Sequence, residues 1–236
     1  MSVKLKLFLT AITIMLTVII LNVLGLELWS SSVELLMVPG IAIFYFIRGE
    51  KVLGLTLFFI FHSLGNIVNV LDFNQISDWS YYLCNSLYIL AYIAFICYVS
   101  KDLKFLYLFK NNKLDLSVLV ILAFSMVYVL IEILLPIEFD SNYIYLIQLI
   151  EFTFSLVLVV LMSLSFFKYI QFSSKKFFFL FLGCLCLVFA ELILIGYYYI
   201  AEYVLISYTS TVLYVSAFFM LYYHTLINHV SFIETE

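Results

Sequence analysis

Long apolar runs alternate with short polar joints along the whole chain of 236 residues. A helix needs about 20 residues to cross roughly 30 Å of hydrocarbon. Eight runs approach this length, at about residues 5–26, 30–47, 52–71, 80–99, 116–135, 143–167, 177–197 and 203–224. The second is the weakest, because it holds Glu34 and the pair Pro39-Gly40, which can kink or split a span. The pattern predicts an all-α polytopic membrane helix bundle with about eight transmembrane helices, in a single domain over residues 1–236.

The positions of the charges assign sides to these spans. With eight spans, every lysine and arginine falls on one side: Lys4, Lys6, Arg48, Lys51, Lys101, Lys104, Lys110, Lys113, Lys168, Lys175 and Lys176. The opposite joints carry acidic residues (Glu27, Asp72, Asp78, Glu138, Asp140 and Glu202) and an aromatic belt (Trp29, Trp79, Tyr81, Tyr82, Tyr143 and residues 197–199). Basic residues are enriched in cytoplasmic loops. We therefore expect both termini in the cytoplasm of a multi-pass protein, in the bacterial inner membrane.

The first run is expected to be a retained span rather than a cleaved signal peptide. Only Lys4 and Lys6 precede it, and no small-residue cleavage site occurs before Glu27. The basic segment 101–115 is read either as a short amphipathic helix on the inner membrane surface or as an ordinary loop.

Composition excludes several classes of protein. Hydrophobic residues make up 66% of the chain and charged residues 11%, against about a quarter charged in soluble domains. No basic patch supports nucleic-acid binding, so membrane lipids are the expected partners. The four cysteines lie within apolar runs and are read as packing residues, and no metal site or cofactor is expected. Serine-nucleophile, zinc-protease and phosphate-loop motifs are missing from the sequence.

Polar residues within the spans indicate where chemistry is expected, because they are costly to bury in hydrocarbon. His62, Asn66 and Asn69 share one helix face by their spacing, and Gln148 and Glu151 do so on another span. Asn66 and Glu191 each lie fourteen residues from the inner ends of their spans at Val52 and Phe177, or roughly 21 Å.

These positions predict one polar pocket in the outer half of the bundle that holds a ligand or substrate. The alternative is that these side chains only join the helices by hydrogen bonds. A buried carboxyl favours its neutral form, so Glu191 is the leading proton donor and Glu151 a second candidate. His62 is read as a hydrogen-bonded bundle histidine, and His224 and His229 as solvated residues at the cytoplasmic end.

Scattered motifs in spans two to eight resemble those of the lysoplasmalogenase-like (YhhN-type) membrane protein family. The family's Lys-Pro pair corresponds to Val38-Pro39, its Gly-Asp pair to Gly65-Asn66, and its His-x-x-Tyr to Asn85 through Tyr88. Its Gly followed eight residues later by Asp corresponds to Gly183 and Glu191, and its span-eight Tyr to Tyr214. The motif Lys, one Asp and the His are replaced here.

The resemblance implies an ether-bond hydrolase that cleaves the vinyl-ether bond of lysoplasmalogens, releasing a fatty aldehyde and a glycerophospho-alcohol. The catalytic candidates are Glu191, as general acid or charge stabiliser, and Asn66, which would position water or substrate. The substrate-binding candidates are Asn85, Tyr88, His62, Glu151 and Tyr214.

Two other classes stay open: a small transporter, for which only Pro39-Gly40 hints at a broken helix, and a non-catalytic lipid-binding, sensor or interaction protein.

Overall fold

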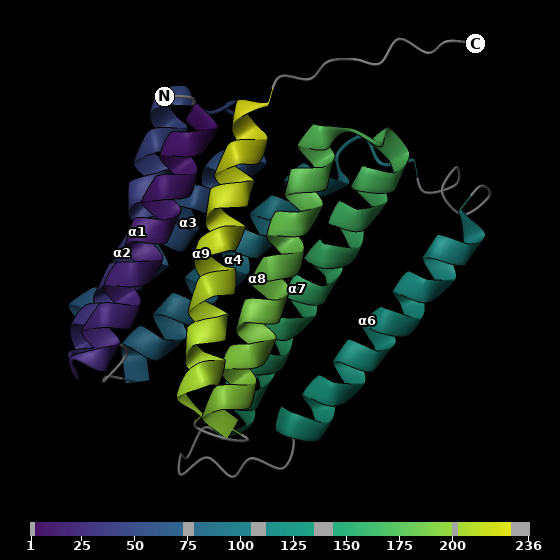
Figure 1. Ribbon diagram of the computed structural model, residues 1–236. Coiled ribbons are helices and arrows are strands. Elements are labelled where there is room, and N and C mark those ends of the chain that lie inside the picture. The colour runs from purple at the N-terminus through teal and green to yellow at the C-terminus, as the bar shows by residue number, and fades with distance from the viewer. Residues whose placement is uncertain (1–2, 73–77, 105–111, 135–143, 200–202, 228–236) are drawn as a thin grey trace.

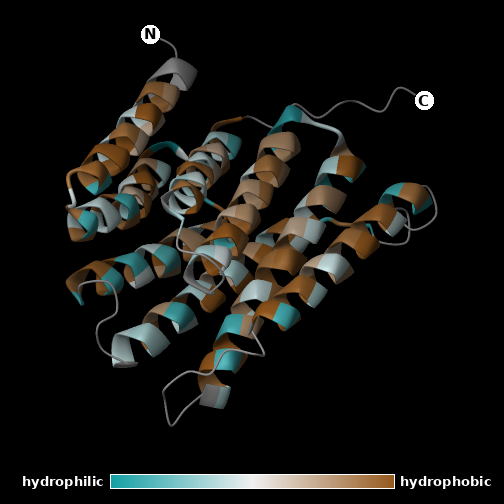
Figure 2. Ribbon diagram, turned by 60° about the horizontal axis from the view of Figure 1, so that its bottom comes forward, coloured by the Kyte–Doolittle hydropathy of each residue, from teal (hydrophilic) through white to brown (hydrophobic). Residues whose placement is uncertain are grey.

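The computed structural model describes residues 3–72, 78–104, 112–134, 144–199 and 203–227. Within these ranges the chain is all-helical, with helices α1 (Val3–Val23), α2 (Glu27–Arg48), α3 (Leu53–Leu71), α4 (Asp78–Ser100), α6 (Lys113–Leu134), α7 (Ile144–Phe172), α8 (Lys175–Tyr199) and α9 (Val204–Leu226). Seven of them, α2 to α9, are long and apolar enough to cross a membrane, and α1 contributes a shorter apolar stretch, Leu7–Val23. Apolar residues cover the helices along most of their length (Figure 2). The prediction of a multi-pass helical membrane bundle is confirmed at this level.

Six helices form a closed ring, in which α2 packs on α3, α3 on α4, α4 on α7, α7 on α8, α8 on α9, and α9 back on α2. Helix α1 lies outside the ring against α2 and α9, and α6 lies outside it against α7 (Figure 1). The start of α1 and the end of α9 lie at the same end of the bundle (Figure 1). The interior of this ring holds the buried polar residues discussed below.

Successive helices run in opposite directions, so the charged joints sort to two ends (Figure 1). We call one the basic end, because it carries Arg48, Lys51, Lys101, Lys104, Lys113, Lys168, Lys175 and Lys176. We call the other the acidic end, where Glu27 begins α2 and Asp72 ends α3. The segment 105–111, Glu138, Asp140, Tyr143, Glu202 and His229 lie outside the described residues.

Helix α2 is continuous through Pro39, so the Pro39-Gly40 pair does not split span two. A proline inside a helix has no N–H group for the carbonyl four residues earlier, which here belongs to Leu35. That carbonyl instead accepts a hydrogen bond of 2.7 Å from the Asn66 side-chain amide on α3. The neighbouring helix thus satisfies the group that the proline frees, which is how a membrane span tolerates proline.

An aromatic layer, formed by Phe58, Phe59, Phe95 and Phe218, fills the ring about one to two helical turns from the basic end. All four side chains are fully buried. The Phe58 ring stacks on Phe95 with centroids 4.5 Å apart, and it is parallel to Phe218 at 6.0 Å. Along α3, α4 and α9 this layer separates the polar residues of the acidic half from those of the basic end.

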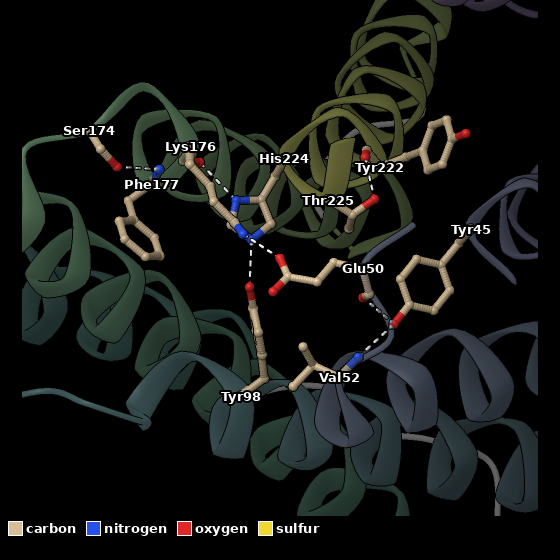
Figure 3. Close-up of polar contacts among 10 residues, drawn as sticks. All are labelled: Tyr45, Glu50, Val52, Tyr98, Ser174, Lys176, Phe177, Tyr222, His224 and Thr225. Atoms are coloured by element: carbon tan, nitrogen blue, oxygen red, sulfur yellow. Dashed lines mark hydrogen bonds and ion pairs between the residues drawn. The ribbon is translucent and has the colours of Figure 1, made fainter. Parts of the chain in front are cut away.

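The basic end is closed by a buried network around His224 (Figure 3). Its Nδ1 lies 2.8 Å from the Lys176 carbonyl, and its Nε2 lies 2.7 Å from the Tyr98 hydroxyl. Because a carbonyl only accepts, Nδ1 carries the proton, and in the neutral ring Nε2 accepts from Tyr98. Lys176 forms an ion pair with the half-exposed Glu50. The expectation that His224 is solvated is therefore wrong: its side chain is buried, and its partners come from two helices, Lys176 on α8 and Tyr98 on α4.

Lys168 is also buried at the basic end, although its position near a joint predicts an exposed charge. Its ammonium donates to the carbonyls of Tyr98 and Lys101 at 3.2 and 3.0 Å. These carbonyls belong to the last turn of α4 and to the residue just after it. Carbonyls at the end of a helix have no N–H donor within the helix, and a basic side chain can donate to them instead. Lys168 therefore joins α7 to the end of α4.

Candidate functional site

Asn66 lies at the centre of a polar cluster between α2, α3, α4 and α9. Its side chain is fully buried. The Tyr88 hydroxyl donates to Asn66 Oδ1 at 2.8 Å, and Asn66 Nδ2 donates to the Leu35 carbonyl and, at 3.4 Å, to the Tyr214 hydroxyl. We call Asn66, Tyr88 and Tyr214 the Asn66 cluster. Three of the predicted site residues thus meet, and the amide uses both its donor and its acceptor group within the protein.

Gly65 lets the Tyr88 ring lie directly against α3. A Cβ at this position would be 2.6 Å from the Tyr88 Cε1 atom and 3.0 and 3.1 Å from two other ring carbons. Any side chain here would push the ring away from Asn66. The glycine that precedes Asn66 is therefore required by the approach of α4 rather than by its own backbone conformation.

His62 lies one helical turn from Asn66, toward the aromatic layer. Its Nε2 is 3.2 Å from the Tyr92 hydroxyl, and its ring packs on Tyr88 and Phe218 with centroids 4.9 and 4.8 Å away. Nδ1 is buried and has no hydrogen-bond partner among the described residues. This environment matches the expectation of a buried bundle histidine held by a neighbouring helix.

Glu34 belongs to the same half of the ring, although the sequence pattern marks it only as a weakness of span two. Its carboxylate oxygen accepts a hydrogen bond of 3.0 Å from the Thr211 hydroxyl on α9. The signal that identifies Glu151 and Glu191, an acid within an apolar run, applies equally to Glu34. Glu34, Glu151 and Glu191 are therefore three acids within the spans of the ring, in its acidic half.

Glu191 lines a small cavity between α7 and α8, together with Ser155, Leu158, Val159, Val188, Leu192 and Ile195. Within the described part of the chain no hydrogen bond reaches the Glu191 carboxyl. The Ser155 hydroxyl is likewise buried without a partner among the described residues. Apart from these two residues the lining is aliphatic, so the cavity offers one acid and one hydroxyl in apolar surroundings.

Glu151 lies one turn before Ser155 on α7, toward the acidic end. The Tyr81 hydroxyl on α4 donates to its Oε1 at 2.6 Å. Asn85, which the motif comparison places near the substrate, donates instead to the Tyr81 carbonyl of its own helix at 2.9 Å. Tyr81 is predicted only as a residue of the aromatic belt, and its contact with Glu151 depends on how α4 packs on α7.

The predicted site residues form two groups rather than one. Asn66 is absent from the residues that line the Glu191 cavity, and no hydrogen bond joins these two side chains within the described residues. They are connected indirectly, because Tyr88 and Tyr214 bond to Asn66 and also interact electrostatically with Glu191. The Glu191 group lines a small cavity, which the residues of the Asn66 cluster do not line.

Replacing Asn66 by Asp is expected to destabilise the protein by about 1–3 kcal/mol, the cost of leaving a buried polar group unsatisfied. An ionised aspartate cannot donate and a protonated one has a single O–H, so the two bonds that Asn66 Nδ2 donates, to the Leu35 carbonyl freed by Pro39 and to the Tyr214 hydroxyl, cannot both be kept. Thermal unfolding in detergent would measure this loss. Asn112→Asp, at the start of α6, is the control and should change the melting temperature little. An Asn66→Asp protein as stable as the wild type would contradict this role.

Chemically, the small Glu191 cavity presents one carboxyl and one hydroxyl in apolar surroundings, whereas the Asn66 cluster is internally satisfied and supports the helices. No protein-family model, curated protein or solved structure matches this chain, so the resemblance to the YhhN-type family stays a prediction from its motifs.

Proposed function

We propose that this chain hydrolyses vinyl-ether lysolipids within its membrane, with Glu191 as the general acid. The observation that carries the proposal is the Glu191 carboxyl, which lines an otherwise mostly apolar cavity and is not engaged by a hydrogen bond within the described residues. Intramembrane acids are functional candidates because their burial is costly. The motif resemblance supplies the substrate class.

The proposed reaction begins when Glu191 donates its proton to the alkenyl carbon remote from the ether oxygen. The resulting oxocarbenium ion is stabilised by a nearby carboxylate while water adds to it. The hemiacetal then collapses to a fatty aldehyde and the glycerophospho-alcohol. One water is consumed, no oxidant is needed, and the acid recovers its proton from the water that adds.

Purified protein is expected to release fatty aldehyde from alkenyl lysolipids and no fatty acid from the matching ester lysolipids. The vinyl ether is protonated at carbon, whereas ester cleavage needs a nucleophile, for which the sequence offers no motif. A panel that varies the linkage at a constant head group would measure this preference. Equal turnover of both linkages, or none of either, would contradict the proposal.

The proposed orientation places the basic end in the cytoplasm of a bacterial inner membrane, with the acidic end outside. Basic loops are retained on the cytoplasmic side, and the two ends of this bundle differ sharply in charge. Reporter fusions at residues 72–78 and 138–141 should therefore report a non-cytoplasmic location, and fusions at residues 49–52 a cytoplasmic one. A cytoplasmic signal from either of the first two joints would overturn this orientation.

A non-catalytic lipid-binding protein is the second candidate. The Asn66 cluster favours it, because the hydrogen bonds of these side chains are satisfied between helices. Such a cluster holds helices together without taking part in a reaction. A transporter is less well supported, because the aromatic layer interrupts the polar path between the two halves of the ring.

A further inference from the structure

We infer that the Glu191 cavity binds one water molecule, held between the Glu191 carboxyl and the Ser155 hydroxyl. The cavity and its lining carry this inference, which does not depend on any reaction. A second step rests on the proposed function: the water bound here is the one that the hydrolysis consumes, and Ser155 is the residue that positions it.

The Ser155 hydroxyl needs a partner that its own helix does not supply. Its side chain is 3% exposed, and its oxygen has no hydrogen-bond partner among the described residues. A serine within a helix can bond to the carbonyl one turn earlier, as Ser163 of α7 does to Val159 at 2.9 Å. Ser155 instead lines the cavity. Buried polar groups without a partner in the protein are commonly satisfied by ordered water.

Glu191 presents a second unsatisfied group to the same space. It lines the cavity from α8, and within the described part of the chain no hydrogen bond reaches its carboxyl. The two side chains do not bond each other either, since the Ser155 hydroxyl is without a partner there. Two polar groups that share a cavity without a direct bond are suited to a bridging water. A carboxyl and a hydroxyl together offer the two or more polar contacts that a buried water makes.

The size of the cavity selects water. The centre of a water-sized sphere is free to move within ≈ 10 Å³ of it, at the lower limit of the ~10–15 Å³ that one water needs. The other lining side chains are aliphatic: Leu158, Val159, Val188, Leu192 and Ile195. They offer no competing hydrogen bond, so the water is held by Ser155 and Glu191. A lipid chain does not fit this space, and the alkenyl carbon has to reach Glu191 from outside the cavity.

A water in this position lets one acid serve both halves of the proposed reaction. Glu191 gives its proton to the alkenyl carbon and becomes a carboxylate beside the oxocarbenium ion. The Ser155 hydroxyl donates a hydrogen bond to the water oxygen and holds it in place. That oxygen then bonds to the oxocarbenium carbon, and the proton that the water loses passes to Glu191. The hemiacetal forms, the acid is restored, and no further base is needed.

Thermal unfolding of the purified full-length protein tests the water site without any turnover. Ser155→Ala removes one partner of the water, so the melting temperature should fall by about 2–4 °C, the effect of one lost hydrogen bond in a chain of this size. Ser163→Ala is the matched control, because its hydroxyl bonds to a carbonyl of its own helix. A dry cavity predicts the opposite sign, since deleting an unsatisfied buried hydroxyl stabilises a protein. A Ser155→Ala melting temperature at or above that of Ser163→Ala would overturn the water site.

Competition between water and methanol tests whether this water is the one consumed. Addition of methanol to the oxocarbenium ion gives a mixed acetal, whereas addition of water gives the aldehyde. The wild-type cavity has no room for the extra methyl group, so in dilute methanol the wild type should release aldehyde alone. Ser155→Ala removes one heavy atom from the lining and should form mixed acetal as well, while Ser163→Ala should behave as the wild type. Equal proportions of acetal from the wild type and Ser155→Ala would overturn the positioning role.

The two measurements separate the possible failures. If the wild type forms neither product, the proposed hydrolysis fails, and the melting temperatures alone decide whether the cavity binds water. If the wild type releases aldehyde but Ser155→Ala changes neither the product ratio nor the melting temperature, the water site fails and the hydrolysis stands.

Discussion

Glu191→Gln is expected to lower vinyl-ether hydrolysis by about 10²–10⁴-fold, the contribution typical of a general acid. Glutamine keeps the size of the side chain and its ability to form hydrogen bonds, but it has no proton to donate at this position. The carboxyl faces the cavity between α7 and α8 and has no hydrogen bond to lose within the described residues. The fold should therefore survive, since the amide, like the protonated carboxyl that it replaces, is neutral.

The measurement pairs aldehyde release with the melting temperature of each protein. Glu27→Gln is the matched control, because Glu27 is an exposed acid at the first turn of α2, and it should leave turnover unchanged. Wild-type turnover that persists undiminished in Glu191→Gln would eliminate Glu191 as the acid. Absence of turnover in the wild type, with a Gln variant at least as stable, would favour the lipid-binding alternative.

Gly54→Val is expected to destabilise the bundle by about 3 kcal/mol, at the upper part of the range for overpacked cores. Gly54 lies in the first turn of α3, where α4 passes very close. A Cβ at this position would be 2.7 Å from the Ala94 carbonyl oxygen and 3.0 Å from Tyr98 Cβ. A backbone carbonyl of a packed helix cannot rotate away as the end of a side chain can, so α3 and α4 must separate.

The consequence of that separation reaches the basic end, because Tyr98 is the hydroxyl partner of His224. Gly40→Val is the matched control: Gly40 is also helical, but a Cβ there would meet nothing within 4 Å. Its melting temperature should stay near the wild-type value, as for most substitutions outside packed features. Equal destabilisation by the two substitutions would show that helix propensity, rather than the α3–α4 contact, accounts for the loss.

Hydropathy along the chain predicts the helices well. The expected spans agree with the described helices to within a few residues, as when the run 203–224 becomes Val204–Leu226. This succeeds because hydrocarbon thickness sets the length of an apolar run, and the backbone in a bilayer must satisfy its own hydrogen bonds as a helix. Both constraints act locally, so no knowledge of packing is needed. The acids within the spans are also visible in the sequence, since an acid within an apolar run is rare.

What the sequence by itself determined is therefore the helical membrane class, the approximate spans and a short list of polar residues. Only the tertiary structure decided which of them meet. It brings the Asn66 amide to the Leu35 carbonyl that Pro39 leaves without a donor. It buries His224 against Lys176 and Tyr98, and it places Glu191 at a cavity that Asn66 does not line. The physical reason is that these contacts join residues far apart in the chain on different helices. Helix spacing fixes which residues share a face, but the rotation of each helix and its neighbours in the ring follow from the packing of side chains along the whole helix surface.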